Sequence, residues 1–162
     1  MKALGHVFKY GDNVDTDVII PARYLNSFDP QELASHAMVD IDPEFAGKVQ
    51  PGDIIVARKN FGCGSSREQA PEVIKALGIP CIIAKSFARI FYRNALNNGL
   101  LLLEQPELHD VVKEGGTITV TVNEDVDYNG KKYPIASLPE NLMEIIEAGG
   151  LVKAMRRRNG LD

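Results

Sequence analysis

The sequence has only two cysteines and little excess of charge, and each of these shortages excludes a class of protein; it also has no tryptophan. Cys63 and Cys81 stand apart from each other and from any histidine cluster, so they offer too few ligands for a zinc or iron–sulfur site. Two thiols are also too few for a secreted disulfide scaffold. The 18 basic and 22 acidic residues give a formal net charge of −4, which does not suit a polyanion. We therefore expect no metal held by this chain alone, no nucleic-acid partner and a reducing, cytoplasmic location.

Long apolar runs are also missing. The runs Leu100–Leu103 and Cys81–Ala84 are far too short to cross a bilayer, and the first ten residues contain Lys2 and Lys9 without the apolar stretch of a signal peptide. We expect neither a membrane span nor export. With 162 residues, 44% of them hydrophobic and 25% charged, the composition predicts one globular domain over residues 1–162.

Apolar patterns and breakers predict alternating strands and helices in residues 30–103. The expected elements are a helix over 30–38, a strand over 53–57, a helix that ends near Leu77 before Gly78, a strand over 81–84, a helix over 88–97 and a strand over 100–103. The continuous apolar strands and the β-α-β order predict a parallel sheet covered on both faces.

The remaining third of the chain has a different pattern. Residues 117–122 alternate strictly, and Asn129-Gly130 between two short apolar-polar runs is the sequence signature of a tight β-hairpin. Ser137 and Glu140 have the spacing of a capping box, which predicts a helix that continues to Gly149. The predicted fold is α/β, with a mixed parallel and antiparallel sheet and flanking helices.

The segment 59–71 lies between a predicted strand and a predicted helix and is unusually rich in glycine and polar groups. Gly62 and Gly64 allow backbone conformations that other residues avoid, and Ser65, Ser66 and Arg67 follow at once. Backbone N–H groups that gather at the start of a helix bind anions. The segment therefore predicts a pocket for a carboxylate or a phosphate.

Other interpretations of this segment explain less. It lacks the Lys-Ser/Thr of a P-loop, and Arg67 stands where a dinucleotide fingerprint has its third glycine. Cys63 lies near basic residues, but no base is visible beside it, so we favour an inert thiol over a nucleophile. A turn with a serine helix cap would explain Ser65 alone.

A second polar cluster covers residues 12–17 and contains three aspartates. A calcium loop would need glycine at its sixth position and glutamate at its twelfth, and both are missing. Asp12 and Asn13 fit an Asx turn. The roles of Asp15 and Asp17 stay open at this point.

Three segments, 15–25, 60–68 and 84–94, together resemble the small subunits of 3-isopropylmalate dehydratase in the aconitase superfamily. The resemblance covers nearly the whole chain. It implies the swivelling β/β/α fold and docking on a separate large subunit, which holds a 4Fe-4S cluster. It also implies isomerisation of 2-isopropylmalate to 3-isopropylmalate, a small dicarboxylic acid, by dehydration and rehydration in leucine biosynthesis.

The resemblance also implies roles for single residues. Ser65 would remove the proton beside a carboxylate, Arg67 would clamp that carboxylate, and Ser66 and Gly64 would complete the substrate-binding loop. Asp17 matches an acidic position that faces a histidine of the large subunit, which gives it an orienting role. A lysine could not reproduce the paired hydrogen bonds that an arginine makes with a carboxylate.

Selectivity is expected from residues 24–28. Relatives that act on tricarboxylates have an arginine near Asn26, whereas the uncharged Asn26, with Leu25 and Phe28, favours an alkyl substituent. Citramalate, 2,3-dimethylmalate and homoaconitate are alternative substrates, and a non-catalytic anion-binding module is the alternative of another class. Gln69 departs from the histidine of many relatives.

The other polar residues receive plainer interpretations. Residues 85–89 and 93–94 fit a packed amphipathic helix, and Arg156–Arg158 fit a solvated helix end or a partner contact. The three histidines are scattered, so a local serine–histidine hydrolase has no support in the sequence.

Overall fold

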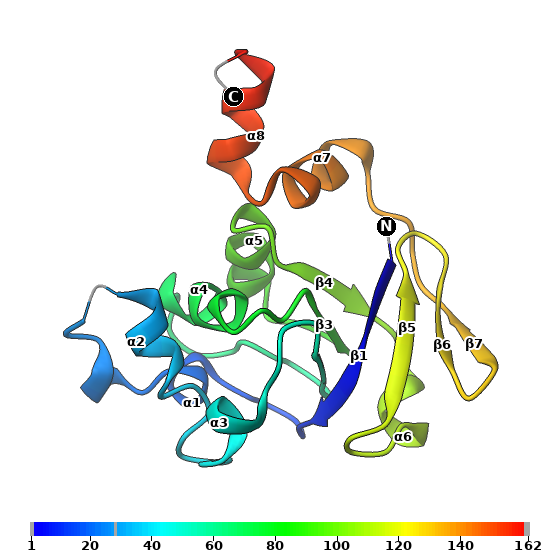
Figure 1. Cartoon of the computed structure of the whole chain (residues 1–162), viewed down its shortest axis with the longest axis horizontal. Helices are drawn as coiled ribbons and strands as arrows, with labels where there is room; N and C mark the ends of the chain where they lie inside the picture. The colour runs from blue at the N-terminus through cyan, green and yellow to red at the C-terminus, as the bar shows by residue number, and fades with distance from the viewer. Residues whose placement is uncertain (1, 28, 161–162) are drawn as a thin grey trace.

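The computed structural model describes residues 2–27 and 29–160, in which seven strands form one mixed sheet (Figure 1). The strands are β1 (Lys2–Lys9), β2 (Ile54–Val56), β3 (Cys81–Ala84), β4 (Leu101–Glu104), β5 (Thr117–Thr121), β6 (Asp125–Tyr128) and β7 (Lys131–Pro134). The α-helices are α1 (Thr16–Ile19), α2 (Pro30–Ala34), α3 (Phe45–Lys48), α4 (Gln69–Ala76), α5 (Arg89–Asn97), α6 (Leu108–Val111), α7 (Glu140–Ala148) and α8 (Leu151–Arg158), and a 3-10 turn, η1, covers Ala22–Tyr24.

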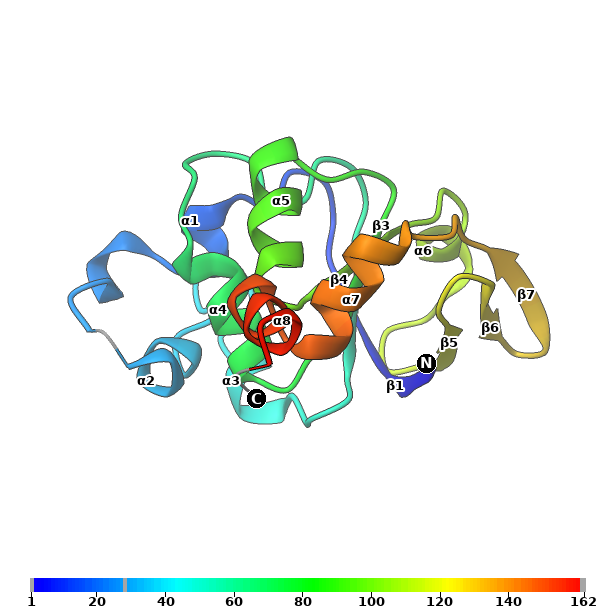
Figure 2. The ribbon, with the colours of Figure 1, turned by 90° about the horizontal axis from the view of Figure 1, so that it is seen from above.

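The sheet changes its strand direction at β1. Its order is β4-β3-β2-β1-β5-β6-β7, in which the first four strands are parallel and β5, β6 and β7 continue antiparallel from β1. Both the parallel half and the hairpin at Asn129-Gly130 confirm the sequence predictions. Figures 1 and 2 place α1–α3 and the β6–β7 hairpin at opposite ends of the molecule.

The parallel strands are continuously apolar because both faces of the sheet are covered. Ile55 and Ile82 face one hydrophobic cluster together with Val73 of α4, whereas Ile54 and Ile83 face a second cluster. Helices α2, α3 and α4 supply the first cluster, and α6, α7 and the antiparallel strands supply the second. The alternation of side chains along each strand therefore divides the core into two layers.

Two helix predictions need correction. The helix expected over 30–38 ends at Ala34, because Met38 is fully buried at φ +60° and its N–H donates to the Ile19 carbonyl at 3.0 Å. The capping box at Ser137 is wrong: α7 begins after Pro139 without a side-chain cap. The Ser137 hydroxyl instead donates to the Asn123 carbonyl at 3.2 Å.

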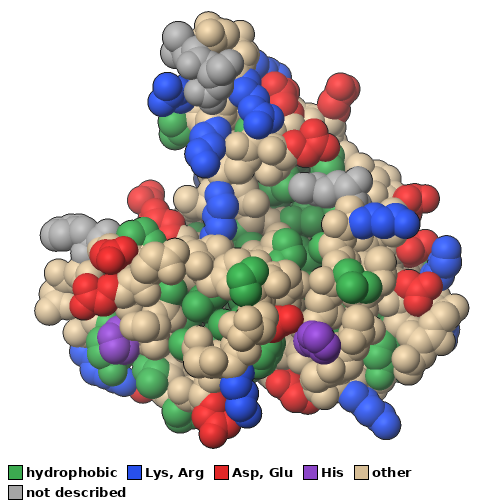
Figure 3. All heavy atoms as spheres, viewed as in Figure 1, with side chains coloured by type: hydrophobic (Ala, Val, Ile, Leu, Met, Phe, Trp, Pro, Cys, Tyr) green, Lys and Arg blue, Asp and Glu red, His purple; other side chains and the backbone are tan. Residues whose placement is uncertain are grey.

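The last helix, α8, continues the chain beyond the expected end of α7 at Gly149, which adopts φ +89°. Its basic side chains stand out at the top of the space-filling view (Figure 3). Arg158 donates two hydrogen bonds to the Glu144 carboxylate, at 2.9 and 3.0 Å, so the basic run forms a helix end tied to α7. Of the helices in residues 2–27 and 29–160, none has the length and apolar character of a membrane span.

Strand β1 was not expected from the sequence, although it lies at the centre of the sheet. Burial alternates from Leu4 to Val7, but the sequence hides this alternation, because the outward Leu4 is apolar and 67% exposed and the buried Gly5 has no side chain. Gly5 is required for a geometric reason: a Cβ atom there would overlap the carbonyl oxygen of Gly52. Close approach of two backbones, rather than side-chain pattern, defines this strand.

We expect Gly5→Ala to lower the free energy of unfolding by about 1 to 3 kcal/mol, because the added methyl must displace the backbone at Gly52. Urea denaturation followed by circular dichroism measures the change. Gly11→Ala is the matched control, since no atom lies within 4 Å of a Cβ at Gly11. Equal stability of the two variants would contradict the close approach.

Candidate active site

The glycine-rich loop leaves the carboxyl end of β2 and leads into α4. A neighbouring loop leaves the carboxyl end of β3 and leads into α5, and an isolated parallel bridge between Phe61 and Phe87 joins the two loops. The Phe61 N–H donates to the Ser86 carbonyl at 3.1 Å, and the Ala88 N–H donates to the Phe61 carbonyl at 3.0 Å. The two loops are therefore held side by side beyond the carboxyl ends of β2 and β3.

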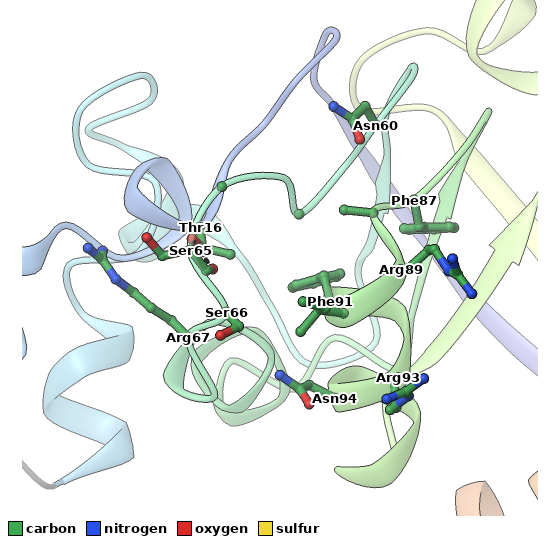
Figure 4. A pocket seen from close by; sticks show the side chains of 14 residues that line it. Thr16, Asn60, Ser65, Ser66, Arg67, Phe87, Arg89, Phe91, Arg93 and Asn94 are labelled. Atoms are coloured by element: carbon green, nitrogen blue, oxygen red, sulfur yellow. Dashed lines mark hydrogen bonds between the residues drawn. The ribbon is translucent and has the colours of Figure 1, made fainter.

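A cavity of about 610 Å³ lies between the two loops (Figure 4). One wall comes from the first loop and α1, and the other from the second loop and α5. The lining residues are Thr16, Asn60, Gly62, Gly64, Ser65, Ser66, Arg67, Phe87, Ala88, Arg89, Ile90, Phe91, Arg93 and Asn94. The structure thus brings four of the predicted site residues, Gly64–Arg67, to one cavity.

Ser65 and Ser66 are exposed in this cavity, and neither hydroxyl has a hydrogen-bond partner within the described part of the chain. The backbone that carries them is held firmly. The Thr16 hydroxyl donates to the Ser65 carbonyl at 2.8 Å, and the Thr16 N–H donates to the Cys63 carbonyl at 2.9 Å. Thr16 is 2% exposed, so a buried threonine of α1 fixes a loop whose hydroxyls remain available.

Backbone amides add positive potential to the same wall. Among the described residues, the N–H groups of Gly64, Ser65 and Ser66 donate to no acceptor. Gly62 and Gly64 adopt φ values of +85° and +91°, which turn the loop so that these groups stay unpaired. Gly62 has a second constraint, because a Cβ there would overlap the Phe91 ring.

Arg67 is anchored at one end of its guanidinium. Nη1 donates to Oδ1 of Asp17 at 2.9 Å and to the Ile20 carbonyl at 3.2 Å. In Figure 4 the side chain extends away from the α5 residues Phe91 and Asn94. The Nε and Nη2 donors have no partner among the described residues, and together they form an edge that suits a carboxylate.

The charges of the site follow from these contacts. The Arg67 guanidinium, and after it the Ala22 N–H at 3.1 Å, lower the pKa of Asp17. Asp17 is thus a carboxylate that orients Arg67 within this chain. Burial, and after it the charge of Asp15, raises the pKa of the Cys63 thiol, which supports the interpretation of an inert thiol over a nucleophile.

Histidine and metal-binding groups are absent from this site. His6 lies near Asp53, His36 stacks on Tyr24, and His109 contacts the Tyr10 carbonyl, so none of the three lines the cavity. Within residues 2–27 and 29–160, no three His, Cys, Asp or Glu side chains come together in a way that could hold a metal. The donors of the described residues therefore do not fit an iron–sulfur cluster.

The residues expected to select the substrate lie elsewhere. Leu25 is partly buried against the first core cluster, and Asn26 is exposed in the turn before α2; neither lines the cavity. Phe28 lies outside the described residues. The expectation that this segment selects the substrate stays a prediction.

Ten of the fourteen lining residues were not among the expected site residues, and four of these ten are Thr16, Asn60, Arg93 and Asn94. Thr16 and Asn60 come from the two polar clusters, and Arg93 and Asn94 come from α5, which the sequence analysis treated as a packed helix. Their signal in the sequence was weak, because a helix start at the carboxyl edge of a parallel sheet becomes recognisable only once strand order is known.

Comparison with known proteins identifies the family. Residues 13–108 match the family model of the aconitase C-terminal domain. The chain belongs to this family. The match includes β2, β3 and β4 and both loops of the cavity, so the expected superfamily is confirmed.

Relatives of this aconitase-family chain are similar over its whole length. It is 63% identical to a 3-isopropylmalate dehydratase small subunit of Lachnospira eligens, over 99% of this chain and 98% of that protein. It is 57% identical to a 2,3-dimethylmalate dehydratase small subunit of Eubacterium barkeri, over 94% and 95% of the two chains. The chain is thus of the hydro-lyase small-subunit type.

A solved structure confirms the expected β/β/α fold. The crystal structure of a 3-isopropylmalate dehydratase from Methanocaldococcus jannaschii superimposes with a TM-score of 0.93 at 46% identity. The superposition covers 99% of this chain and 97% of that one. The direction change at β1 and the helices on both faces therefore belong to the fold of the family.

The ion pair predicts a titration effect in the chain alone. Because Arg67 lowers the pKa of Asp17 in the folded state, the pair stabilises the fold above the pKa of the unfolded carboxyl, and this contribution is lost as the pH falls through the lowered pKa. We expect Arg67→Gln to raise the pKa of Asp17 in an NMR titration. Arg58→Gln, which removes the partner of Asp12 instead, is the control. An unchanged Asp17 titration in Arg67→Gln would contradict the pairing.

Proposed function

We propose that this chain is the small subunit of a dehydratase that interconverts 2-isopropylmalate and 3-isopropylmalate, with Ser65 as the group that moves the proton. The cavity supports the proposal most directly, because it presents a solvent-accessible Ser65 hydroxyl beside unpaired amides and an arginine. Isomerisation by dehydration and rehydration requires removal of a proton beside a carboxylate and its later return. Both tasks fall to one hydroxyl in this arrangement.

A serine hydroxyl is a weak base in water, so the site must stabilise its deprotonated form. The unpaired N–H groups of Gly64, Ser65 and Ser66 and the permanent charge of Arg67 supply positive potential on that wall. Preorganised donors of this kind can each be worth about 3 to 4 kcal/mol in a transition state. The same donors stabilise the negative charge that develops on the substrate.

Arg67 binds the substrate carboxylate through its Nε–Nη2 edge in this proposal. The opposite end of the guanidinium is held by Asp17 and by the Ile20 carbonyl, so the planar group has one orientation before substrate arrives. Preorganisation reduces the entropy that binding must overcome. Asp17 is then a positioning residue that acts through Arg67.

The 4Fe-4S cluster of the enzyme belongs to the large subunit in this proposal. No group of side chains in the described residues could bind an iron–sulfur cluster, and the relatives are named as small subunits. The part of this chain is to bind one carboxylate of the acid and to exchange its proton.

A second substrate has a specific observation in its favour. The relative from Eubacterium barkeri is named for 2,3-dimethylmalate and is 57% identical, which is close to the identity with several isopropylmalate relatives. The two acids differ only in their alkyl groups, and one methylene is worth only about 1 to 3 kcal/mol in a hydrophobic pocket. Rates on both acids therefore distinguish the two candidates.

Ser65→Ala is expected to lower kcat on isopropylmalate by about 10² to 10⁴-fold, because it removes the group that exchanges the proton. The reaction is followed with this chain reconstituted with its cognate large subunit. Ser66→Ala, the matched control, is expected to cost about tenfold or less, the effect of one neutral hydrogen bond. A Ser65→Ala enzyme with the wild-type rate would disprove the role of Ser65. A wild-type mixture without activity on isopropylmalate would disprove the proposed reaction.

Asn26→Arg tests the selecting segment outside the cavity lining. The added cation is expected to reduce kcat/KM for alkyl-substituted acids and to favour homoaconitate, whose extra carboxylate it can pair with. Rates on isopropylmalate, citramalate, 2,3-dimethylmalate and homoaconitate measure the preference. Ser27→Arg places the same charge on the adjacent residue as a control. An unchanged preference would place the selecting contacts on another segment.

A further inference from the structure

Two arginines at the start of α5 have no acidic partner in the described chain. Arg23, Arg67 and Arg158 each pair with a carboxylate, at distances between 2.5 and 2.9 Å. Arg89 and Arg93 form no ion pair with any described residue, and both are exposed. Their charges are therefore available to a group outside this chain.

The position of these arginines is unfavourable for the chain alone. Arg89 begins α5, Arg93 follows one turn later, and the first turn of α5 contains no acidic residue. Cations at the N-terminal end of a helix oppose its dipole, and like charges four residues apart repel each other. Local stability does not explain two arginines here, which directs attention to binding.

Between the arginines, Ile90 is 55% exposed at the rim of the cavity. A second hollow of about 320 Å³ lies beyond this rim, and Arg89 and Arg93 line both hollows. We call Arg89, Ile90 and Arg93 the α5 rim. It is a ridge between two depressions, with an apolar side chain between two charges.

The rim does not belong to the wall that carries the serines. In Figure 4, Arg89 and Arg93 extend on the side of the cavity away from Ser65 and Ser66. The second hollow includes one carboxylate, that of Glu104, and it pairs with neither arginine. A small dicarboxylate bound at Arg67 is thus not the natural partner of these charges.

We propose that the α5 rim is the surface on which the large subunit docks, and that the large subunit presents to it an apolar patch flanked by acidic side chains. The assignment rests on the proposed function, which requires a second protein to complete the cavity. Charge complementarity identifies the occupant: two unpaired guanidinium groups around an exposed isoleucine fit carboxylates around an apolar centre. Docking there covers the cavity from its α5 side, across from Ser65.

The test measures binding of the full chain to the cognate large subunit without substrate, by isothermal titration calorimetry over a range of salt concentrations. The double variant Arg89→Glu/Arg93→Glu is expected to weaken binding at least tenfold at low salt and to flatten the salt dependence. Ile90→Ala is expected to weaken binding severalfold with the salt dependence unchanged. Lys131→Glu/Lys132→Glu makes the same change of charge on β7, at the opposite edge of the sheet, and should alter the affinity less than twofold.

The possible results separate the docking surface from the proposed function. Wild-type affinity in the Arg89→Glu/Arg93→Glu variant would overturn the docking surface. If the reconstituted variant enzyme then showed a raised KM in a rate assay, the arginines would be assigned to substrate binding. Self-association of this chain that the same variant abolishes would assign the rim to a second copy instead. Absence of any complex with the wild-type chain would count against the proposed function itself. Circular dichroism of each variant verifies that the fold is retained.

Discussion

The site depends on the parallel pairing of β2 and β3. The two strands are in register through Ile55–Ile82 and Val56–Ile83, and the Phe61–Phe87 bridge extends this pairing past the strand ends. Two loops that are more than twenty residues apart in sequence therefore leave the sheet together. Parallel strands place their carboxyl ends at the same edge, so the helices that follow both begin at the cavity. Displacement of this pairing would separate the serine wall from the α5 wall.

The functional groups combine rigid backbone with available side chains. Thr16, which is buried, and Gly62, which has no space for a Cβ, fix the path of the loop. The hydroxyls of Ser65 and Ser66 nevertheless have no partner in the described chain. A site held ready in this way loses little entropy when a ligand binds. Its open side is consistent with a cavity that a second protein completes, as the proposed function requires.

Local features of the sequence were predictable, and contacts between distant residues were not. The strand over 81–84 and the Asn129-Gly130 turn are as expected because short-range pattern and turn chemistry determine them. The loop residues Gly64–Arg67 were found because the motif is contiguous. The contact between Arg67 and Asp17 joins residues 50 positions apart, and no local pattern in the sequence indicated it; the orienting role of Asp17 toward a histidine of the large subunit stays a prediction. β1 was missed because a backbone contact at Gly5, not an apolar pattern, defines it.

The central place of β1 also bears on how the chain acquires its structure. Lys2 pairs with Thr121, and Lys9 pairs with Val56, so the partners of β1 lie as far as 119 and 47 positions later in the sequence. Contacts of such long sequence separation slow folding, because a large loop must close before the pairing compensates for the lost entropy. Until then β1 has two unpaired edges, and aggregation through strand edges is the hazard of that interval. We therefore expect pairing at β1 to be slower than formation of the local β-α-β units.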